Sequence, residues 1–223
     1  MASRWGAVFD FDGVVVNTER HHEVCWQQVA KERNQPMTHE QYVSGFGVKN
    51  ERFIREILAW TNDDEEIRRI AKRKEAIFQQ HAEKNSIDLI QGVQTFLLEL
   101  EKEGIPCAIA SSSILKNIEI VLEHSPVRRY FAEIVSGEDV AHGKPNPECF
   151  IRAAAKLKLP TERCVVFEDA LLGVEAAKKA GCKVVAITTT FPKHEFAGLG
   201  FAMEKIVKDF EEIDLKEIDS WFQ

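Results

Sequence analysis

The chain has 223 residues, enough for one large domain or two small ones. Hydrophobic residues make up 44% of it and charged residues 29%, as in folded globular proteins, and no apolar run approaches the ~20 residues of a membrane-spanning helix. The net charge of −7 and the lack of a basic face argue against a nucleic-acid partner, so we expect binding to neither nucleic acid nor membrane.

The cysteine content favours a reducing environment. Five cysteines are present, an odd number, and no CxxC pair occurs, so neither a disulfide framework nor a zinc site is indicated. Free thiols fit the cytoplasm or the matrix of a reducing organelle. The first ten residues, MASRWGAVFD, lack a basic region followed by an apolar core, and we therefore expect no secretory signal.

The first predicted element is a buried strand at residues 6–11, and helical patterns without a convincing strand follow it. These predicted helices span residues 19–33, 38–44, 50–60 and 63–83. In the last of them the apolar residues fall on one stripe, as in a helix with one buried face: Ile67, Ile70, Ala71, Ile77 and Phe78. The basic run at residues 72–74 of the same helix predicts a solvated face.

From about residue 87 onward, apolar runs typical of buried parallel strands alternate with helical patterns. Strands are predicted at residues 106–110, 132–135, 164–167 and 183–187, and helices at residues 94–103, 147–157 and 175–180. Gly104 and Gly181 suit the left-handed position after a helix end. The alternation predicts an α/β fold with a doubly wound, Rossmann-like parallel sheet. Residues 1–17 and 87–223 would form this core, and residues 18–86 a small helical domain inserted after the first strand.

Polar residues follow the predicted strands at positions where their side chains can meet. They are Asp10 at the end of the first strand and Asp12 in the loop after it, Ser111 after the second strand, Lys144 before the helix that follows the third, and Glu168 with Asp169 at the end of the fourth. Ligands of open α/β sheets bind beyond the carboxyl ends of the strands, so we expect these side chains to gather at one edge. Clustered acids repel and raise one another's pKa unless a cation neutralises them. Such an oxygen-rich cluster suits Mg²⁺, which also binds phosphate.

Four segments, DFDGVVVNTE, ASS, GKPNPECF and FEDALLGVEAA, resemble in order and spacing the four motifs of the haloacid dehalogenase superfamily. The resemblance covers residues 6–188 and is greatest to the β-phosphoglucomutase-like branch of phosphatases and mutases. The helical insert resembles the small cap domain of that superfamily. The resemblance implies a phosphoric monoester hydrolase that depends on Mg²⁺.

The same resemblance implies roles for the first motif. Asp10 would be the nucleophile that becomes an aspartyl phosphate. Asp12 would protonate the leaving oxygen and then take a proton from water, and its backbone carbonyl would bind the metal. Gly13 would allow the sharp turn that aims both carboxylates at the phosphate. Without the later motifs, the pair could equally be a turn-forming Asp-x-Asp-Gly.

The later motifs supply the phosphate and metal contacts that the resemblance implies. Ser111 would donate a hydrogen bond to a phosphoryl oxygen, although Ser112 and Ser113 compete with it for that task and for capping the next helix. Lys144 would offset negative charge on the nucleophile and on the transferred group. Asp169 would bind the metal together with Asp10 and Asp12, and Glu168 would be a further ligand or an outer partner.

Departures from the branch bear on the reaction. Asn17 replaces an aspartate common in relatives, at a position that does not bind the metal. The segment SGFGVKNERF resembles the specificity loop of the cap, and Asn50, preceded by Lys49, stands where the mutase has an arginine that binds a second phosphate. Ile114 stands where the mutase has a lysine. These losses favour a phosphatase over a mutase.

The remaining candidates concern the substrate. Ser112, Lys49, Asn50 and His22 are candidate substrate-binding residues. For His22 and its neighbour His21 an ordinary helix surface is the preferred interpretation, and a position facing the site is the alternative. Sugar phosphates are the commonest substrates of the branch, whereas AKRKEAIF and GVKNERF resemble members that dephosphorylate a pyrimidine intermediate of riboflavin synthesis.

The leading prediction is therefore a monomeric phosphatase of a small phosphorylated metabolite, either a sugar phosphate or a nucleotide or flavin-precursor monophosphate. A sugar-phosphate mutase and a non-catalytic relative that binds phosphometabolites remain the alternatives.

Overall fold

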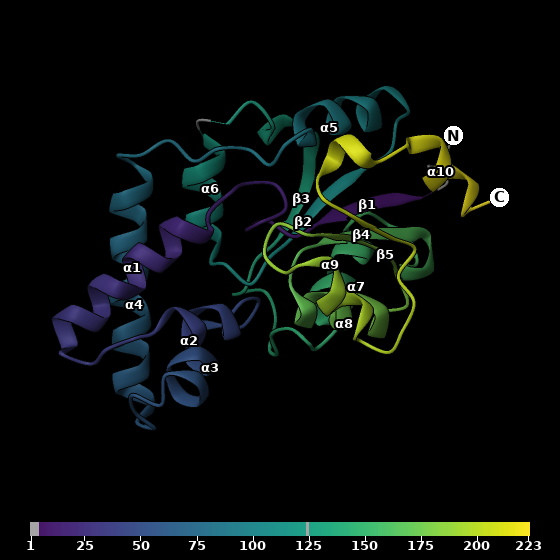
Figure 1. Cartoon of the computed structure of the whole chain (residues 1–223). Helices are drawn as coiled ribbons and strands as arrows, with labels where there is room; N and C mark the ends of the chain where they lie inside the picture. The colour runs from purple at the N-terminus through teal and green to yellow at the C-terminus, as the bar shows by residue number, and fades with distance from the viewer. Residues whose placement is uncertain (1–4, 124) are drawn as a thin grey trace.

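The computed structural model describes residues 5–123 and 125–223, and these build a six-stranded, fully parallel sheet (Figure 1). Its strands are β1 (Gly6–Phe9), β2 (Cys107–Ala110), β3 (Phe131–Val135), β4 (Cys164–Glu168), β5 (Lys183–Ile187) and β6 (Lys205–Val207). They lie in the order β3-β2-β1-β4-β5-β6, so the chain builds outward from β1 in one direction and then in the other. This reversal beside β1 is the switch point at which doubly wound sheets bind ligands. The predicted fold class is confirmed.

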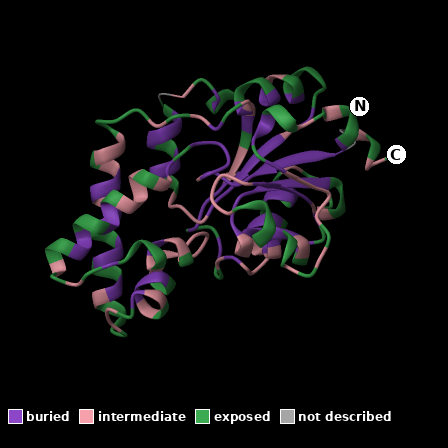
Figure 2. Cartoon of the chain, in the orientation of Figure 1, coloured by how far each residue is buried: buried purple, intermediate pink, exposed green. Residues whose placement is uncertain are grey.

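Helices cover the sheet on both faces (Figure 1). Those that follow β1 and the insert are α5 (Val93–Lys102), α6 (Leu115–Glu123), α7 (Glu148–Lys156), α8 (Leu171–Lys179), α9 (Lys193–Ala197) and α10 (Leu215–Ser220). Alternate residues of each strand point to opposite faces, and two hydrophobic cores result. Phe9 and Phe167 belong to one core, where they stack at 4.7 Å beside α5 and Phe210, while Val8 and Val166 belong to the other. Strands β1, β2 and β4 are buried throughout, whereas the edge strands β3 and β6 are only partly buried (Figure 2).

Between β1 and α5 the chain forms a group of helices, here called the insert, which lies beside the sheet domain (Figure 1). It comprises α1 (Glu19–Arg33), α2 (His39–Ser44), α3 (Asn50–Arg52) with a π-helical turn at Phe53–Ile57, and α4 (Asp64–Ala82). The predicted apolar stripe of α4 is buried, and α4 packs along α1. The prediction of a single helix over residues 50–60 is wrong, because the chain changes to π-helical hydrogen bonding after Arg52.

The two connections between the insert and the sheet domain run side by side. Val16 and Leu89 form an isolated antiparallel bridge, and the Asn17 amide donates to the Asp88 carbonyl at 2.8 Å. Asn17 itself is exposed. The chain thus leaves and re-enters the sheet domain at one place, next to the end of β1.

Several sequence-based expectations need correction. The first strand ends at Phe9 rather than at residue 11, because the chain turns at the two aspartates. Strand β6 and helices α6, α9 and α10 were not predicted. The solvated face predicted for residues 72–74 is wrong at Lys74, which is 4% exposed and ion-paired with Glu75. The left-handed glycines 104 and 181 are confirmed, as are buried free thiols.

Within the described ranges, no helix combines the length and the apolar character that crossing a membrane requires.

Candidate active site

The two aspartates of the opening motif leave β1 in a tight turn. The Asp10 amide donates to the Phe167 carbonyl of β4 at 2.9 Å, so Asp10 still follows the sheet. Gly13 has φ +80°, a conformation that side chains rarely adopt. A Cβ atom there would also lie 1.9 Å from an oxygen of Asp169. Glycine is therefore required both for the turn and for the close approach of the second acid-bearing loop.

Asp10 is held by a buried lysine. The Lys144 ammonium donates to Asp10 Oδ1 at 2.8 Å and to Glu168 Oε1 at 2.5 Å, and all three side chains are almost fully buried. Burial alone would lower the pKa of Lys144, but the two carboxylates raise it above its ordinary value. The ammonium is therefore permanently charged. Glu168 is fixed further because its Oε2 accepts the Ala170 amide at 2.7 Å.

Three acids form a candidate metal centre. Asp10, Glu168 and Asp169 each offer a carboxylate oxygen, and these oxygens lie within 4.8 Å of one another. Burial, with Glu168 as a negative neighbour, raises the pKa of Asp10 to about 7 despite Lys144, and burial with Glu168 and Asp10 raises that of Asp169. Buried carboxylates that repel one another in this way suit a divalent cation, because hard divalent cations prefer oxygen ligands. A buried cluster of acids that could hold a divalent cation is thus present, as expected.

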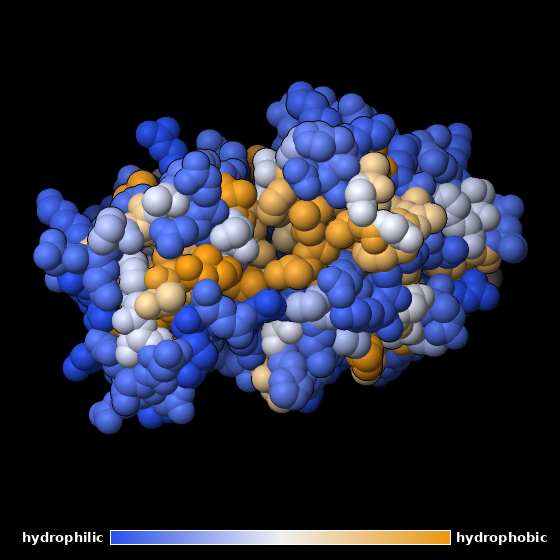
Figure 3. All heavy atoms as spheres, turned by 60° about the horizontal axis from the view of Figure 1, so that its bottom comes forward, coloured by the Kyte–Doolittle hydropathy of each residue, from blue (hydrophilic) through white to orange (hydrophobic). Residues whose placement is uncertain are grey.

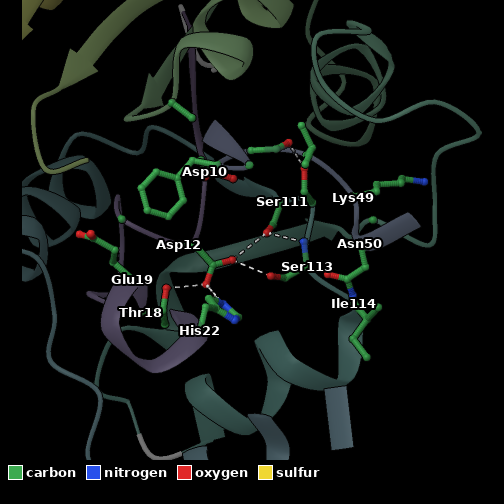
Figure 4. Close-up of a pocket in the computed structure, with 18 of the residues that line it drawn as sticks. Asp10, Asp12, Thr18, Glu19, His22, Lys49, Asn50, Ser111, Ser113 and Ile114 are labelled. Atoms are coloured by element: carbon green, nitrogen blue, oxygen red, sulfur yellow. Dashed lines mark hydrogen bonds and ion pairs between the residues drawn. The ribbon is translucent and has the colours of Figure 1, made fainter. Parts of the chain in front are cut away.

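Asp12 faces the cavity and collects hydrogen bonds (Figure 4). Its Oδ1 accepts from the Thr18 hydroxyl at 2.6 Å and from His22 Nε2 at 3.1 Å, and its Oδ2 accepts from the Ser113 hydroxyl at 2.6 Å. The Ser111 hydroxyl is 3.5 Å away. Burial would raise the pKa of Asp12, but His22 and the two hydroxyls hold it below its ordinary value.

His22 connects Asp12 to a lysine of the insert. The Lys74 ammonium lies 3.0 Å from His22 Nδ1 and can only donate, so the ring proton resides on Nε2 and is donated to Asp12. The ring stacks on Phe78 with centroids 4.2 Å apart. His22 thus faces the site, whereas His21 contacts His81 at 2.9 Å. The preferred interpretation of both as ordinary helix surface is wrong for His22.

A cavity of about 350 Å³ lies between the insert and the sheet domain, and Asp10 and Asp12 line it. Figure 3 shows hydrophobic surface gathered along the hollow between the two parts. The same cavity is lined by Lys49, Asn50, Ser112 and Ile114. The polar side chains of the first three already make hydrogen bonds within the protein. Lys49 Nζ donates to the Val140 carbonyl at 2.8 Å, Ser112 to the Gly47 carbonyl at 3.0 Å, and Asn50 to Glu75.

Sequence reasoning missed four side chains that shape this site: Thr18, Lys74, Glu75 and Thr190. Ser113 was considered only as a competitor of Ser111, whereas its hydroxyl donates to Asp12. Thr18 is the N-cap residue of α1, but its side chain makes no capping hydrogen bond, and its hydroxyl donates to Asp12. Thr190 donates to Asp169 from the loop after β5. A polar residue after the fifth strand was the available signal for Thr190, since every strand end reaches this edge. The adjacent Lys74 and Glu75 gave no such signal, because basic and acidic residues next to one another on a helix are also typical of a solvent-exposed face.

The fold and site define an α/β protein with a lysine-held aspartate and a buried acid cluster that could hold a cation, at the carboxyl edge of its sheet. The sequence matches the family of haloacid dehalogenase-like hydrolases over residues 7–187, and the chain belongs to this family. The resemblance drawn from the motifs is confirmed.

Individual relatives cover most of the chain. It is 35% identical over 98% of its length to a chloroplastic 5-amino-6-(5-phospho-D-ribitylamino)uracil phosphatase of Arabidopsis thaliana, and spans 59% of that protein. It is 30% identical to β-phosphoglucomutase of Bacillus subtilis (strain 168), over 81% of each chain. The crystal structure of a family IA, variant 3 hydrolase from Entamoeba histolytica superposes with a TM-score of 0.88 at 26% identity, covering 98% of this chain and 99% of that one.

Proposed function

We propose that this protein is a Mg²⁺-dependent phosphatase that hydrolyses a small phosphorylated metabolite through an aspartyl-phosphate intermediate. One observation carries the proposal: Asp10 belongs both to the three-acid cluster and to the ion pair with Lys144, and it lines the cavity together with Asp12. Such an arrangement offers a nucleophile, a cation site and a proton donor to one phosphate group.

In the first step, an Asp10 oxygen attacks phosphorus while the bond to the leaving oxygen breaks. Lys144 orients the attacking carboxylate, and its charge with the Ser111 hydroxyl stabilises the transferred group. Asp12 protonates the leaving oxygen. Mg²⁺, when bound by Asp10, Asp169 and the Asp12 carbonyl, would neutralise charge on the phosphoryl oxygens. Glu168 already accepts hydrogen bonds at both oxygens, which favours it as the partner of Lys144 over a direct ligand.

In the second step, Asp12 takes a proton from water, the water oxygen attacks phosphorus, and the bond to Asp10 breaks as phosphate leaves. The lowered pKa of Asp12 keeps this carboxylate ionised, so that it can accept a proton. For the first step Asp12 must carry a proton. The negative charge of a bound phosphate monoester raises the pKa of a neighbouring carboxyl group, so substrate binding itself favours that state.

We infer that residues 18–86 act as a cap that excludes bulk water and contacts the leaving group. Its helices supply His22, Lys49 and Asn50 to the cavity, and its two connections to the sheet domain pair beside β1. The similarity to a ribitylaminouracil phosphatase and the resemblance of the cap segments support a sugar phosphate or a flavin-precursor monophosphate as substrate.

The proposal is tested by phosphate release from a panel of sugar phosphates, nucleotides and flavin precursors with Mg²⁺, in wild type and in Asp10→Asn. The amide is a very poor nucleophile of the same size, so turnover should fall at least a thousandfold, about 4 kcal/mol in transition-state stabilisation, with an unchanged circular-dichroism spectrum. Excess chelator should abolish wild-type activity, and added Mg²⁺ should restore it. Residual Asp10→Asn activity above a tenth of wild type, or full turnover in chelator, would contradict the mechanism.

The similarity to β-phosphoglucomutase raises a sugar-phosphate mutase as the second candidate. A mutase needs cationic groups for a second phosphate, yet Asn50 is bound to Glu75 and Ile114 is apolar. Incubation with a hexose 1-phosphate and a trace of bisphosphate separates the two: isomerisation without release of phosphate would identify the mutase.

A further inference from the structure

An ion pair buried in the insert has no part in the steps above. Lys74 and Glu75 are consecutive residues of α4, 4% and 9% exposed, and both line the cavity. Lysine and glutamate are rarely buried, because removing their charges from water costs more than one contact returns. The burial of the Lys74–Glu75 pair at the cavity therefore points to a role in the cavity.

Three donors from three separate elements converge on the Glu75 carboxylate. Lys74 donates to Oε1 at 3.2 Å, Asn50 of α3 donates to the same oxygen, and Asn117 of α6 donates to Oε2. The amide of Asn117 is oriented by Gln79, whose Nε2 donates to its Oδ1 at 3.1 Å. Since α6 belongs to the sheet domain, Glu75 bridges the insert and the sheet domain.

One ammonium and two amide groups pointing at one spot form a set of donors that binds phosphate or carboxylate groups. In this protein the Glu75 carboxylate already accepts from all three donors. Hydrogen bonds and the neighbouring ammonium keep the pKa of Glu75 below its ordinary value, so the group is charged. The other lysine among the described cavity-lining residues, Lys49, donates to the Val140 carbonyl and is not directed at this spot.

Glu75 is linked to Asp12 by a chain of contacts, and both residues line the cavity. The contacts run from Asp12 to His22, from His22 to Lys74 and from Lys74 to Glu75. A substrate whose phosphate meets Asp10 and whose leaving oxygen meets Asp12 extends its remaining atoms toward this group. The charge of Glu75 therefore acts on the leaving group and not on the phosphate being transferred.

We propose that Glu75 is a built-in anion that fills an anion site in the leaving-group part of the cavity, and thereby selects monophosphates with an uncharged leaving group. A second phosphate on the substrate would meet a fixed negative charge and donors that are already occupied. The proposal rests on the proposed phosphatase function and deepens it by naming a specificity-determining residue and the class of leaving group.

Equilibrium binding tests this without depending on turnover. The dissociation constants of fructose 1-phosphate and fructose 1,6-bisphosphate are measured by titration calorimetry with Mg²⁺ in Asp10→Asn protein and in the double variant with Glu75→Gln. In the Asp10→Asn protein we expect the monophosphate to bind at least tenfold more tightly than the bisphosphate. Glu75→Gln should shift the ratio of the two constants at least tenfold toward the bisphosphate, because the fixed charge is gone and Lys74 is released.

Glu51→Gln in the Asp10→Asn background is the matched control, since Glu51 is an exposed acid that lines the same cavity. It should leave the ratio within threefold of the starting value. Thermal unfolding establishes whether each variant is folded. If the Glu75→Gln protein is unfolded, the ratio of the two dissociation constants in Asp10→Asn alone decides for or against the proposal.

Equal binding of the two sugars in Asp10→Asn, no binding of either, or an unchanged ratio in folded Glu75→Gln would each overturn the proposal. Failure of the phosphatase function shows separately, as wild-type protein that releases no phosphate from any compound of the panel.

Discussion

Gly173 illustrates how a residue without a side chain fixes the chemistry of the site. It lies in the first turn of α8, where alanine would ordinarily be preferred by about 1 kcal/mol. A Cβ atom at this position would lie 1.7 Å from Glu168 Oε1, the oxygen that accepts the Lys144 ammonium. Glycine is therefore kept so that Glu168 can reach Lys144.

We predict that Gly173→Ala lowers both activity and stability. Glu168 must move, Lys144 loses one of its two buried partners, and Asp10 loses its orientation. The expected cost is about 2–4 kcal/mol in the free energy of unfolding and at least tenfold in kcat, measured by denaturant titration and phosphate release. Gly104→Ala is the control, because nothing lies within 4 Å of its Cβ position; it should cost about 1 kcal/mol of backbone strain and no activity. Wild-type kcat in Gly173→Ala would refute the requirement.

At the scale of elements, the loop between α2 and α3 is one place where the insert contacts the sheet domain, beside the contact of α4 with α6. Gly47 accepts from Ser112, Lys49 donates to Val140, and Phe46 packs edge-on against Phe191 with centroids 6.0 Å apart. These contacts are two hydrogen bonds and one aromatic contact, and they would have to break if the insert opens as the proposed cap.

Alanine at Lys49 or Asn50 should alter substrate choice more than stability. Lys49→Ala removes a contact that closes the loop, and Asn50→Ala removes one donor from Glu75. We expect kcat/KM for the best metabolite to fall about tenfold or more, while a small aryl phosphate, which fills little of the cavity, changes less than threefold. Equal losses on both substrates would mean that the loop supports the chemistry or the fold. No change on either would contradict the placement of these residues at the substrate.

At the scale of the whole molecule, the acid cluster makes stability depend on pH and metal. Folding raises the pKa of Asp10 to about 7 and raises that of Asp169, both from 3.8, mainly through burial. Groups with raised pKa values stabilise the fold fully below pH 3.8, and this contribution is lost as the pH rises through the raised values. Near pH 8 the metal-free protein therefore carries repelling buried carboxylates.

Asp169→Asn should consequently be more stable than wild type when metal is absent. In chelator at pH 8 we expect a gain of about 1–3 kcal/mol in the free energy of unfolding, shrinking at pH 5, where Asp10 is largely protonated. With saturating Mg²⁺ the order should reverse, because the variant has lost a carboxylate for the cation. Denaturant titrations at both pH values measure this. A variant that is less stable than wild type in chelator at pH 8 would show that Asp169 is not under repulsion.

Local patterns allowed much of the fold to be predicted. Apolar runs predicted five of the strands, two of them preceded by helix-ending glycines, and the apolar stripe predicted α4, because burial of a strand or a helix face leaves a pattern in the sequence. Strand β6 has only three residues, Lys205–Val207, too few for a pattern. The π-helical turn after Arg52 also escaped, since its hydrogen bonding follows from packing in the insert.

The sequence by itself determined the family and the residues at the sheet edge, because acids, serine and lysine at successive strand ends must meet wherever a parallel sheet forms. Tertiary structure alone decided the partners of those residues. That Thr18 bonds Asp12 instead of capping α1, that His22 faces inward, and that Glu75 collects donors from α3, α4 and α6 depend on how the insert packs on the sheet domain. Contacts between segments so far apart in the chain leave no period or spacing that a single sequence displays.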